Sequence, residues 1–92
     1  MNSSLRLMLV EDHNIVRQGL RSLLEGRGFE ISGETDNGRD AIAMAGEKLP
    51  DVIIMDIGLP KLRGIEAARK IKKEHPRIKI IMLTIHTNEK YI

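Results

Sequence analysis

The sequence contains no cysteine and no tryptophan, and it has one Phe and one Tyr among its 92 residues. Without cysteine the chain forms no disulfide and offers no thiolate to a metal ion. This absence fits a reducing cytoplasm, and we expect a cytoplasmic location. With so few aromatic rings, the chain also lacks platforms on which nucleic-acid bases stack. The composition therefore excludes a disulfide scaffold and a thiolate metal centre.

Long hydrophobic runs and an excess of one charge are lacking as well. No apolar stretch approaches the roughly 20 residues that a membrane-spanning helix needs, so we expect no membrane partner. The 15 basic and 13 acidic residues leave a formal net charge of +2, which does not indicate nucleic-acid binding. Basic residues do gather late in the chain, and we interpret them as a solvated helix face and its exit loop: Arg69, Lys70, Lys72, Lys73, Arg77 and Lys79.

Apolar residues alternate between strand-like and helix-like patterns along the chain. The patterns predict strands over about 5–10, 29–34, 51–57 and 78–83. They predict helices over about 14–26 and 64–74, and another that Pro50 ends. Asn14 is expected to cap the first helix, and residues 89–92 are expected to begin a further one. This rhythm predicts an α/β fold with a parallel sheet and helices on both faces.

Polar side chains stand where three of the predicted strands stop. Glu11 and Asp12 follow the first strand, Asp56 ends the third, and Thr84 follows the fourth. Because the carboxyl ends of parallel strands form the ligand crevice, we expect these side chains to converge at one edge. Carboxylates about 4 Å apart repel by roughly 4 kcal/mol per pair at an effective dielectric of 20. A hard divalent cation would neutralise them, and Mg²⁺ is the usual oxygen-bound ion near phosphates.

As a set, these residues resemble the receiver domain of bacterial two-component response regulators, most closely the NarL/LuxR-type transcriptional regulators. The resemblance rests on Glu11-Asp12, on Asp56 in Met-Asp-Ile-Gly-Leu-Pro, on Gly64 opening a helix and on Thr84. Residues 10–13 with 16–20, and residues 83–86 with 89–92, look most like that subfamily, and the resemblance covers essentially the whole chain. It implies a flavodoxin-like (CheY-like) doubly wound parallel sheet with strand order 2-1-3-4, with strand five and its helix missing.

The resemblance assigns roles to individual residues. It implies that Asp56 is the phosphoacceptor for a histidine kinase and that Thr84 hydrogen-bonds a phosphoryl oxygen. It implies that Asp12, Asp56 and the main-chain carbonyl of Gly58 ligate Mg²⁺, while Glu11 reaches the ion through water. Such a receiver is not a dedicated enzyme, because it turns over no separate substrate.

The resemblance also sets expectations for the domain and its partners. It implies that residues 1–92 form one receiver domain, incomplete at its C-terminus, and that DNA is bound only through an output domain absent from this chain. The family's lysine after a fifth strand, and the aromatic residue within that strand, match no position here. An unpaired fourth strand leaves an apolar edge. We therefore expect a homo-oligomer that forms through residues 78–83 and the tail 84–92.

Other functions stay open at this point. An interaction module would keep the fold without taking phosphate. A Mg²⁺-dependent phosphohydrolase with an aspartyl nucleophile usually carries a second acid two residues later, where this chain has Gly58. A flavin-binding domain is disfavoured, because no phosphate-binding Gly/Ser/Thr loop follows the first strand. We interpret the three histidines as exposed or packing residues rather than ligands: His13, His75 and His86.

Overall fold

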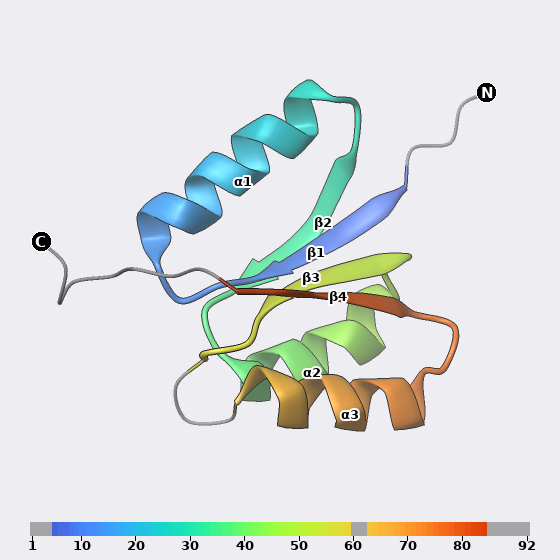
Figure 1. Ribbon diagram of the computed structural model, residues 1–92. Helices are drawn as coiled ribbons and strands as arrows, with labels where there is room; N and C mark the ends of the chain where they lie inside the picture. The colour runs from blue at the N-terminus through green and yellow to red at the C-terminus, as the bar shows by residue number, and fades with distance from the viewer. Residues whose placement is uncertain (1–4, 60–62, 85–92) are drawn as a thin grey trace, which may run out of the picture.

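The computed structural model describes residues 5–59 and 63–84. Its four strands are parallel and form one sheet in the order β2-β1-β3-β4 (Figure 1). The predicted fold class and strand order are therefore confirmed. The strands are β1 (Arg6–Val10), β2 (Glu30–Thr35), β3 (Val52–Asp56) and β4 (Lys79–Leu83). The helices are α1 (Asn14–Gly26), α2 (Gly38–Lys48) and α3 (Gly64–Glu74).

Most element bounds agree with the sequence patterns to within a residue, and α1 and α3 coincide with the predicted helices. The cap of α1 was predicted wrongly. His13 occupies the N-cap position, with extended backbone and no capping hydrogen bond from its side chain. Asn14 is instead the first helical residue, and its Oδ1 accepts a hydrogen bond from Arg17 Nη2 over 2.7 Å. The helix predicted from residue 89 lies outside the described residues.

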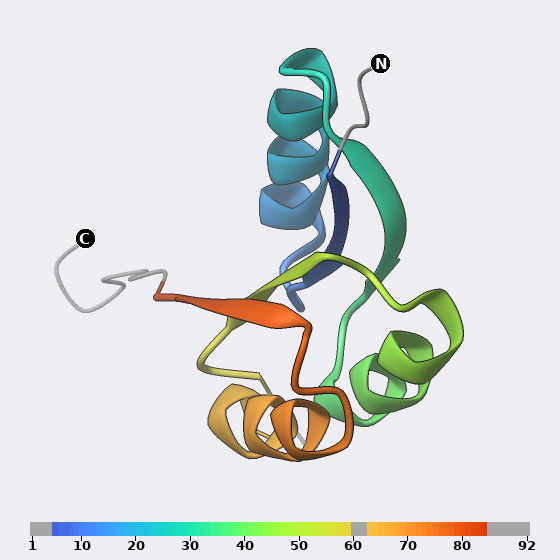
Figure 2. The same cartoon turned by 90° about the vertical axis from the view of Figure 1, so that its right-hand side faces the viewer.

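The helices divide between the two faces of the sheet (Figures 1 and 2). Helix α1 packs on β1 and β2, whereas α2 and α3 lie side by side under the opposite face. The main core fills the space between the sheet and these two helices, where alanines allow close approach. Its buried members are Met8, Val10, Ala41, Ala45, Ile53, Met55, Leu59, Ala67, Ile71 and Ile78.

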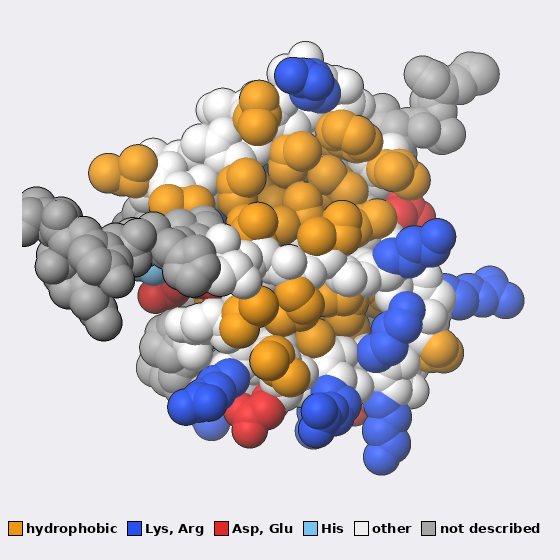
Figure 3. All heavy atoms as spheres, viewed as in Figure 1, with side chains coloured by type: hydrophobic (Ala, Val, Ile, Leu, Met, Phe, Trp, Pro, Cys, Tyr) orange, Lys and Arg blue, Asp and Glu red, His pale blue; other side chains and the backbone are white. Residues whose placement is uncertain are grey.

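The opposite face of β3 and β4 is not covered by any helix of the described segments, because α1 contacts β1 and β2 only. Side chains alternate along a strand, so Ile80 and Met82 pack toward the core while Ile81 points the other way and is 53% exposed. Val52 and Ile54 are half-buried. The continuous apolar run of β3 suggests burial on both faces, as in a central parallel strand, but the structure buries only one face. Figure 3 shows hydrophobic side chains on both sides of β4.

Two left-handed backbone positions turn the chain between elements. Gly28, with φ 94°, redirects the chain after α1, in a conformation that glycine adopts readily. Leu49 takes φ 46° as the C-cap of α2, and Pro50 follows it as the predicted end of that helix.

The late basic residues are exposed, as interpreted, and Lys72 Nζ donates hydrogen bonds to the carbonyls of Pro76 and Ile78. Within the described residues, no helix has the length and apolar character needed to cross a membrane.

Candidate functional site

Three carboxylates and one imidazole meet at the carboxyl edge of the sheet. Glu11 and Asp12 follow β1, and Asp56 is the last residue of β3, which pairs directly with β1. One ligand atom from each of these residues and from His13 lies within 4.8 Å of the others. The sequence predicted the three acids, and the structure adds His13.

Two of the three acidic side chains are almost fully buried. Glu11 is 2% exposed and Asp56 is 6% exposed, whereas the Asp12 side chain is 29% exposed. Within residues 5–59 and 63–84, Glu11 Oε1 and Asp12 Oδ1 are buried and accept no hydrogen bond. Buried carboxylate oxygens without partners are costly, and hard divalent cations bind oxygens of this kind. The donor set present therefore fits a cation such as Mg²⁺.

His13 is tied to this cluster through Glu11. Its main-chain N–H donates to Glu11 Oε2 over 2.9 Å, and its Nδ1 lies 2.7 Å from the same oxygen. Nδ1 is also 3.4 Å from Asp12 Oδ1, close enough for charge attraction but without a hydrogen bond. The hydrogen bond to Glu11 and then the charge of Asp12 raise the pKa of His13 above its usual 6.5. The side chain is exposed, as interpreted, but its link to the site was missed.

Asp56 is oriented by the loop that follows it. The N–H of Gly58 donates to Asp56 Oδ1 over 3.1 Å. The N–H of Ile57 donates to the carbonyl of Leu83 over 3.0 Å, which fastens the start of this loop to β4. For Gly58, the structure thus shows a contact through its N–H, while the metal-binding role of its carbonyl stays a prediction.

Thr84 follows β4 and lies at the same edge of the sheet as the carboxylates. It follows Leu83, the register partner of Asp56, so the strand end brings it to the predicted side. Its side chain is exposed, and in the part of the chain that is described it shares no hydrogen bond with Asp56. The predicted location is therefore found, and the role of its hydroxyl stays a prediction.

The loop that carries Glu11 and Asp12 is clamped by an arginine that sequence reasoning missed. Arg17 Nη1 donates to the main-chain carbonyl of Glu11 over 2.7 Å, and its Nε donates to Glu34 Oε1 over 2.9 Å. Arg21 pairs with the other oxygen of Glu34. The sequence signal was the spacing of the two arginines, one turn apart on α1. The clamp joins α1 and β2 to the acidic loop.

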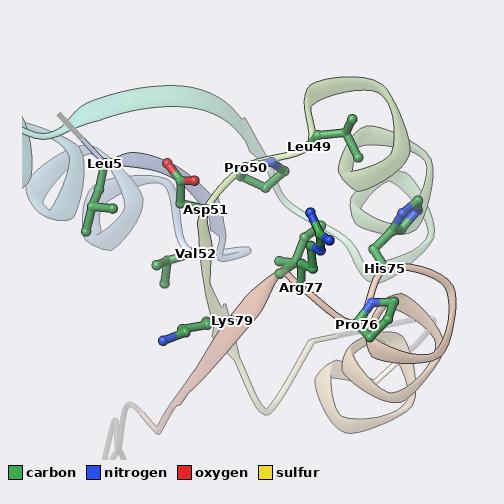
Figure 4. A pocket seen from close by; sticks show the side chains of 10 residues that line it. Leu5, Leu49, Pro50, Asp51, Val52, His75, Pro76, Arg77 and Lys79 are labelled. Atoms are coloured by element: carbon green, nitrogen blue, oxygen red, sulfur yellow. The ribbon is translucent and has the colours of Figure 1, made fainter. Parts of the chain in front are cut away.

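A cavity of about 660 Å³ opens at the amino edge of the sheet, a strand length from the carboxylates. Figure 4 shows Leu49 and Pro50 on one side of it and His75, Pro76 and Arg77 on another. Its one carboxylate, on Asp51, already accepts the N–H of Arg6 over 2.8 Å. This cavity is apart from the candidate site, because the unpartnered buried oxygens of Glu11 and Asp12 lie at the other edge of the sheet.

Comparison with known proteins decides the family. Residues 7–92 match the family model described as the response regulator receiver domain. The chain belongs to this family. The predicted resemblance is therefore confirmed, and the strand order of the receiver domain is the one that it implied.

Curated relatives and solved structures agree with this assignment. The receiver domain is 42% identical over 84 residues to the response regulator UvrY of Escherichia coli, covering 90% of this chain and 38% of that protein. It is 38% identical over 79 residues to the transcription regulator BvgA of Bordetella pertussis, with 86% and 38% covered. A LuxR-family two-component response regulator from an Aurantimonas species superimposes with a TM-score of 0.86 at 38% identity, covering 97% of this chain and 64% of that one. The chain thus spans about 38% of the length of these curated relatives.

Proposed function

We propose that this receiver domain is phosphorylated on Asp56 by a histidine kinase, with Mg²⁺ bound at the acidic cluster. The observation that carries the proposal is the meeting of Asp56 with Glu11 and Asp12 around buried oxygens that lack partners. Perturbed or crowded ionisable groups of this kind are typical of functional sites. The family assignment adds support, because it rests on independent sequence similarity.

The transfer joins a carboxylate to a phosphoryl group. A carboxylate oxygen of Asp56 attacks the phosphorus of the kinase's phosphohistidine, the P–N bond breaks, and the imidazole leaves with its electron pair. Both reacting groups are anionic, and bound Mg²⁺ would supply charge screening and alignment. Asp12, Asp56 and the carbonyl of Gly58 would ligate the ion, and Glu11 would reach it through water. The Gly58 N–H fixes the rotamer of Asp56 by holding Oδ1.

The other expected features follow as parts of the same proposal. Thr84, at the same sheet edge, would hydrogen-bond a phosphoryl oxygen of modified Asp56. The domain would turn over no separate substrate. BvgA is named as a transcription regulator, and we propose that this receiver likewise serves transcription, with DNA bound by a different domain. A phosphohydrolase lacks support, because Gly58 stands where the second acid is needed.

Loss of Asp12 is expected to weaken Mg²⁺ binding by at least about tenfold, because each carboxylate neutralises part of the ion's charge. The wild-type affinity should itself be weak, since Mg²⁺ keeps several of its waters. Titration of wild type and Asp12→Ala, followed by amide NMR shifts, measures both constants. Asp36→Ala is the matched control, because Asp36 is an exposed acid just after β2. Equal affinity in Asp12→Ala, or an equal loss in Asp36→Ala, would refute the assignment.

We also propose that the chain forms a homo-oligomer through β4. This strand is an edge of the described sheet, and its Ile81 is 53% exposed beside half-buried Leu83 and Ile54. Unpaired backbone groups next to an apolar face favour pairing with a second copy. Thr84 is the last described residue of the proposed contact, and the rest of the tail lies outside the described residues.

A charge on the uncovered face is expected to break this oligomer. Ile81→Lys should raise the dissociation constant more than about tenfold, because burying an isoleucine contributes roughly 1.5–3 kcal/mol. Ile15→Lys is the control, since Ile15 is 84% exposed on α1, away from β4. Light scattering over a concentration series measures assembly, and circular dichroism checks folding. A wild-type chain that stays monomeric at high concentration would disprove the proposal.

A further inference from the structure

One oxygen of Glu11 is held twice by the same neighbour. The main-chain N–H of His13 donates to Glu11 Oε2 over 2.9 Å, and Nδ1 lies 2.7 Å from that atom. An ionised carboxylate only accepts, so Nδ1 carries the hydrogen of this bond. Glu11 Oε1 is buried and accepts no hydrogen bond from residues 5–59 or 63–84. His13 therefore makes the two oxygens of Glu11 unequal.

The difference in hydrogen bonding between Oε1 and Oε2 affects cation binding because the Glu11 residue is only 2% exposed. The terminal torsion of a glutamate is broad and roughly two-fold, so the carboxylate has little preference of its own. At a surface position, water would replace a missing donor, but this carboxylate lies inside the protein. Two donors on Oε2 fix the rotation of the carboxylate and leave Oε1 as the oxygen that can reach a cation, through a water as proposed above.

The main chain of Glu11 is held by different groups. Its carbonyl accepts from Arg17 Nη1 over 2.7 Å, and its N–H donates to the carbonyl of Thr35 over 3.1 Å. These contacts fix where the residue lies but do not determine how its carboxylate is turned. His13 supplies that second constraint.

We propose that His13 is a positioning residue for the cation site, committing Glu11 Oε2 to the protein so that Oε1 stays available to Mg²⁺. This inference rests on the proposed function and names a further residue of the same site. His13 is not assigned as a ligand, because its Nδ1 is occupied by Glu11 and Mg²⁺ prefers oxygen to imidazole nitrogen. Hydrogen-bonded partners that orient ligands affect metal affinity in other proteins.

Three variants of the full chain test the proposal. His13→Ala removes the side-chain donor and keeps the main-chain N–H. His13→Asn restores an N–H donor the same number of bonds from the main chain. His75→Ala is the control, because His75 is a half-buried histidine after α3 that lines the cavity at the amino edge. The Mg²⁺ dissociation constant of wild type and of all three variants is measured by calorimetry in the same buffer.

We expect His13→Ala to weaken Mg²⁺ binding by about three- to tenfold, less than the usual 10–100-fold because one donor remains. His13→Asn should stay within about twofold of wild type, as should His75→Ala. In metal-free protein, the carboxylate ¹³C shift of Glu11 should change in His13→Ala and return toward wild type in His13→Asn. That second readout does not depend on the ion.

Unchanged or tighter binding in His13→Ala overturns the inference, and so does an equal loss in His13→Ala and His13→Asn. If wild type binds Mg²⁺ and His13→Ala does not differ from it, only the role of His13 fails. If wild type binds no Mg²⁺, the proposed function fails with it. Unfolding midpoints of all variants separate these effects from loss of structure.

Discussion

Asp56→Asn is expected to abolish labelling of the chain by a small phosphodonor in the presence of Mg²⁺. The amide has the shape of the carboxylate and can still accept the hydrogen bond from the Gly58 N–H. It carries no charge and is a poor nucleophile, so no acyl phosphate forms. Intact mass and site mapping by mass spectrometry, with the phosphodonor in excess, measure the modified fraction and its location.

The matched control is Asp51→Asn, which makes the same chemical change next to the other end of β3. Asp51 is exposed, and its carboxylate accepts the N–H of Arg6 at the amino edge of the sheet. This variant should be labelled to the wild-type extent. Label that persists in Asp56→Asn, or that is lost equally in both variants, would contradict the assignment of Asp56.

The acidic cluster could be predicted because it depends on topology. Once the apolar runs ending at Val10 and Asp56 are read as neighbouring parallel strands, their carboxyl ends meet, whatever the side-chain details. Thr84 was placed at the right edge by the same reasoning. Its exposed side chain shows the limit of that reasoning, because strand order fixes an edge but not a contact.

The supporting contacts could not be predicted from periodicity. His13 and Arg17 reach Glu11 through particular rotamers and through the docking of α1 on β1 and β2. An apolar pattern states which face of a helix is buried, but not which polar side chain crosses to a loop. Burial of β3 was overestimated for a related reason. Burial of the second face of β3 depends on which segments cover it, and α1 packs on β1 and β2 instead.

Any side chain at Gly64 is expected to be destabilising, because this residue opens α3 directly against the backbone of Asp56, the proposed phosphoacceptor. A Cβ there would lie 2.2 Å from the carbonyl oxygen of Asp56 and 3.0 Å from Ile57 Cα. These are main-chain atoms next to the β3–β4 pairing, where Ile57 donates to Leu83. Main-chain atoms cannot rotate away from the added methyl group, as the end of a flexible side chain can. Relief of the clash therefore requires α3 or the Asp56 loop to move.

Gly64→Ala should therefore lower the free energy of unfolding by about 1–3 kcal/mol or more, and slow phosphorylation of Asp56 by up to about 100-fold. Gly33→Ala should cost less, because its closest neighbour is the flexible end of Met44, at 2.7 Å. A Cβ at Gly19 would have no other atom within 4 Å. Gly19→Ala should therefore stabilise α1 by roughly 0.5–1 kcal/mol. Urea unfolding and initial labelling rates rank the three variants.

If Gly64→Ala matched Gly19→Ala in stability, α3 would not pack against Asp56 as closely as described. A Gly64→Ala variant that unfolds more easily but labels at the wild-type rate would show that the contact supports the fold without positioning Asp56.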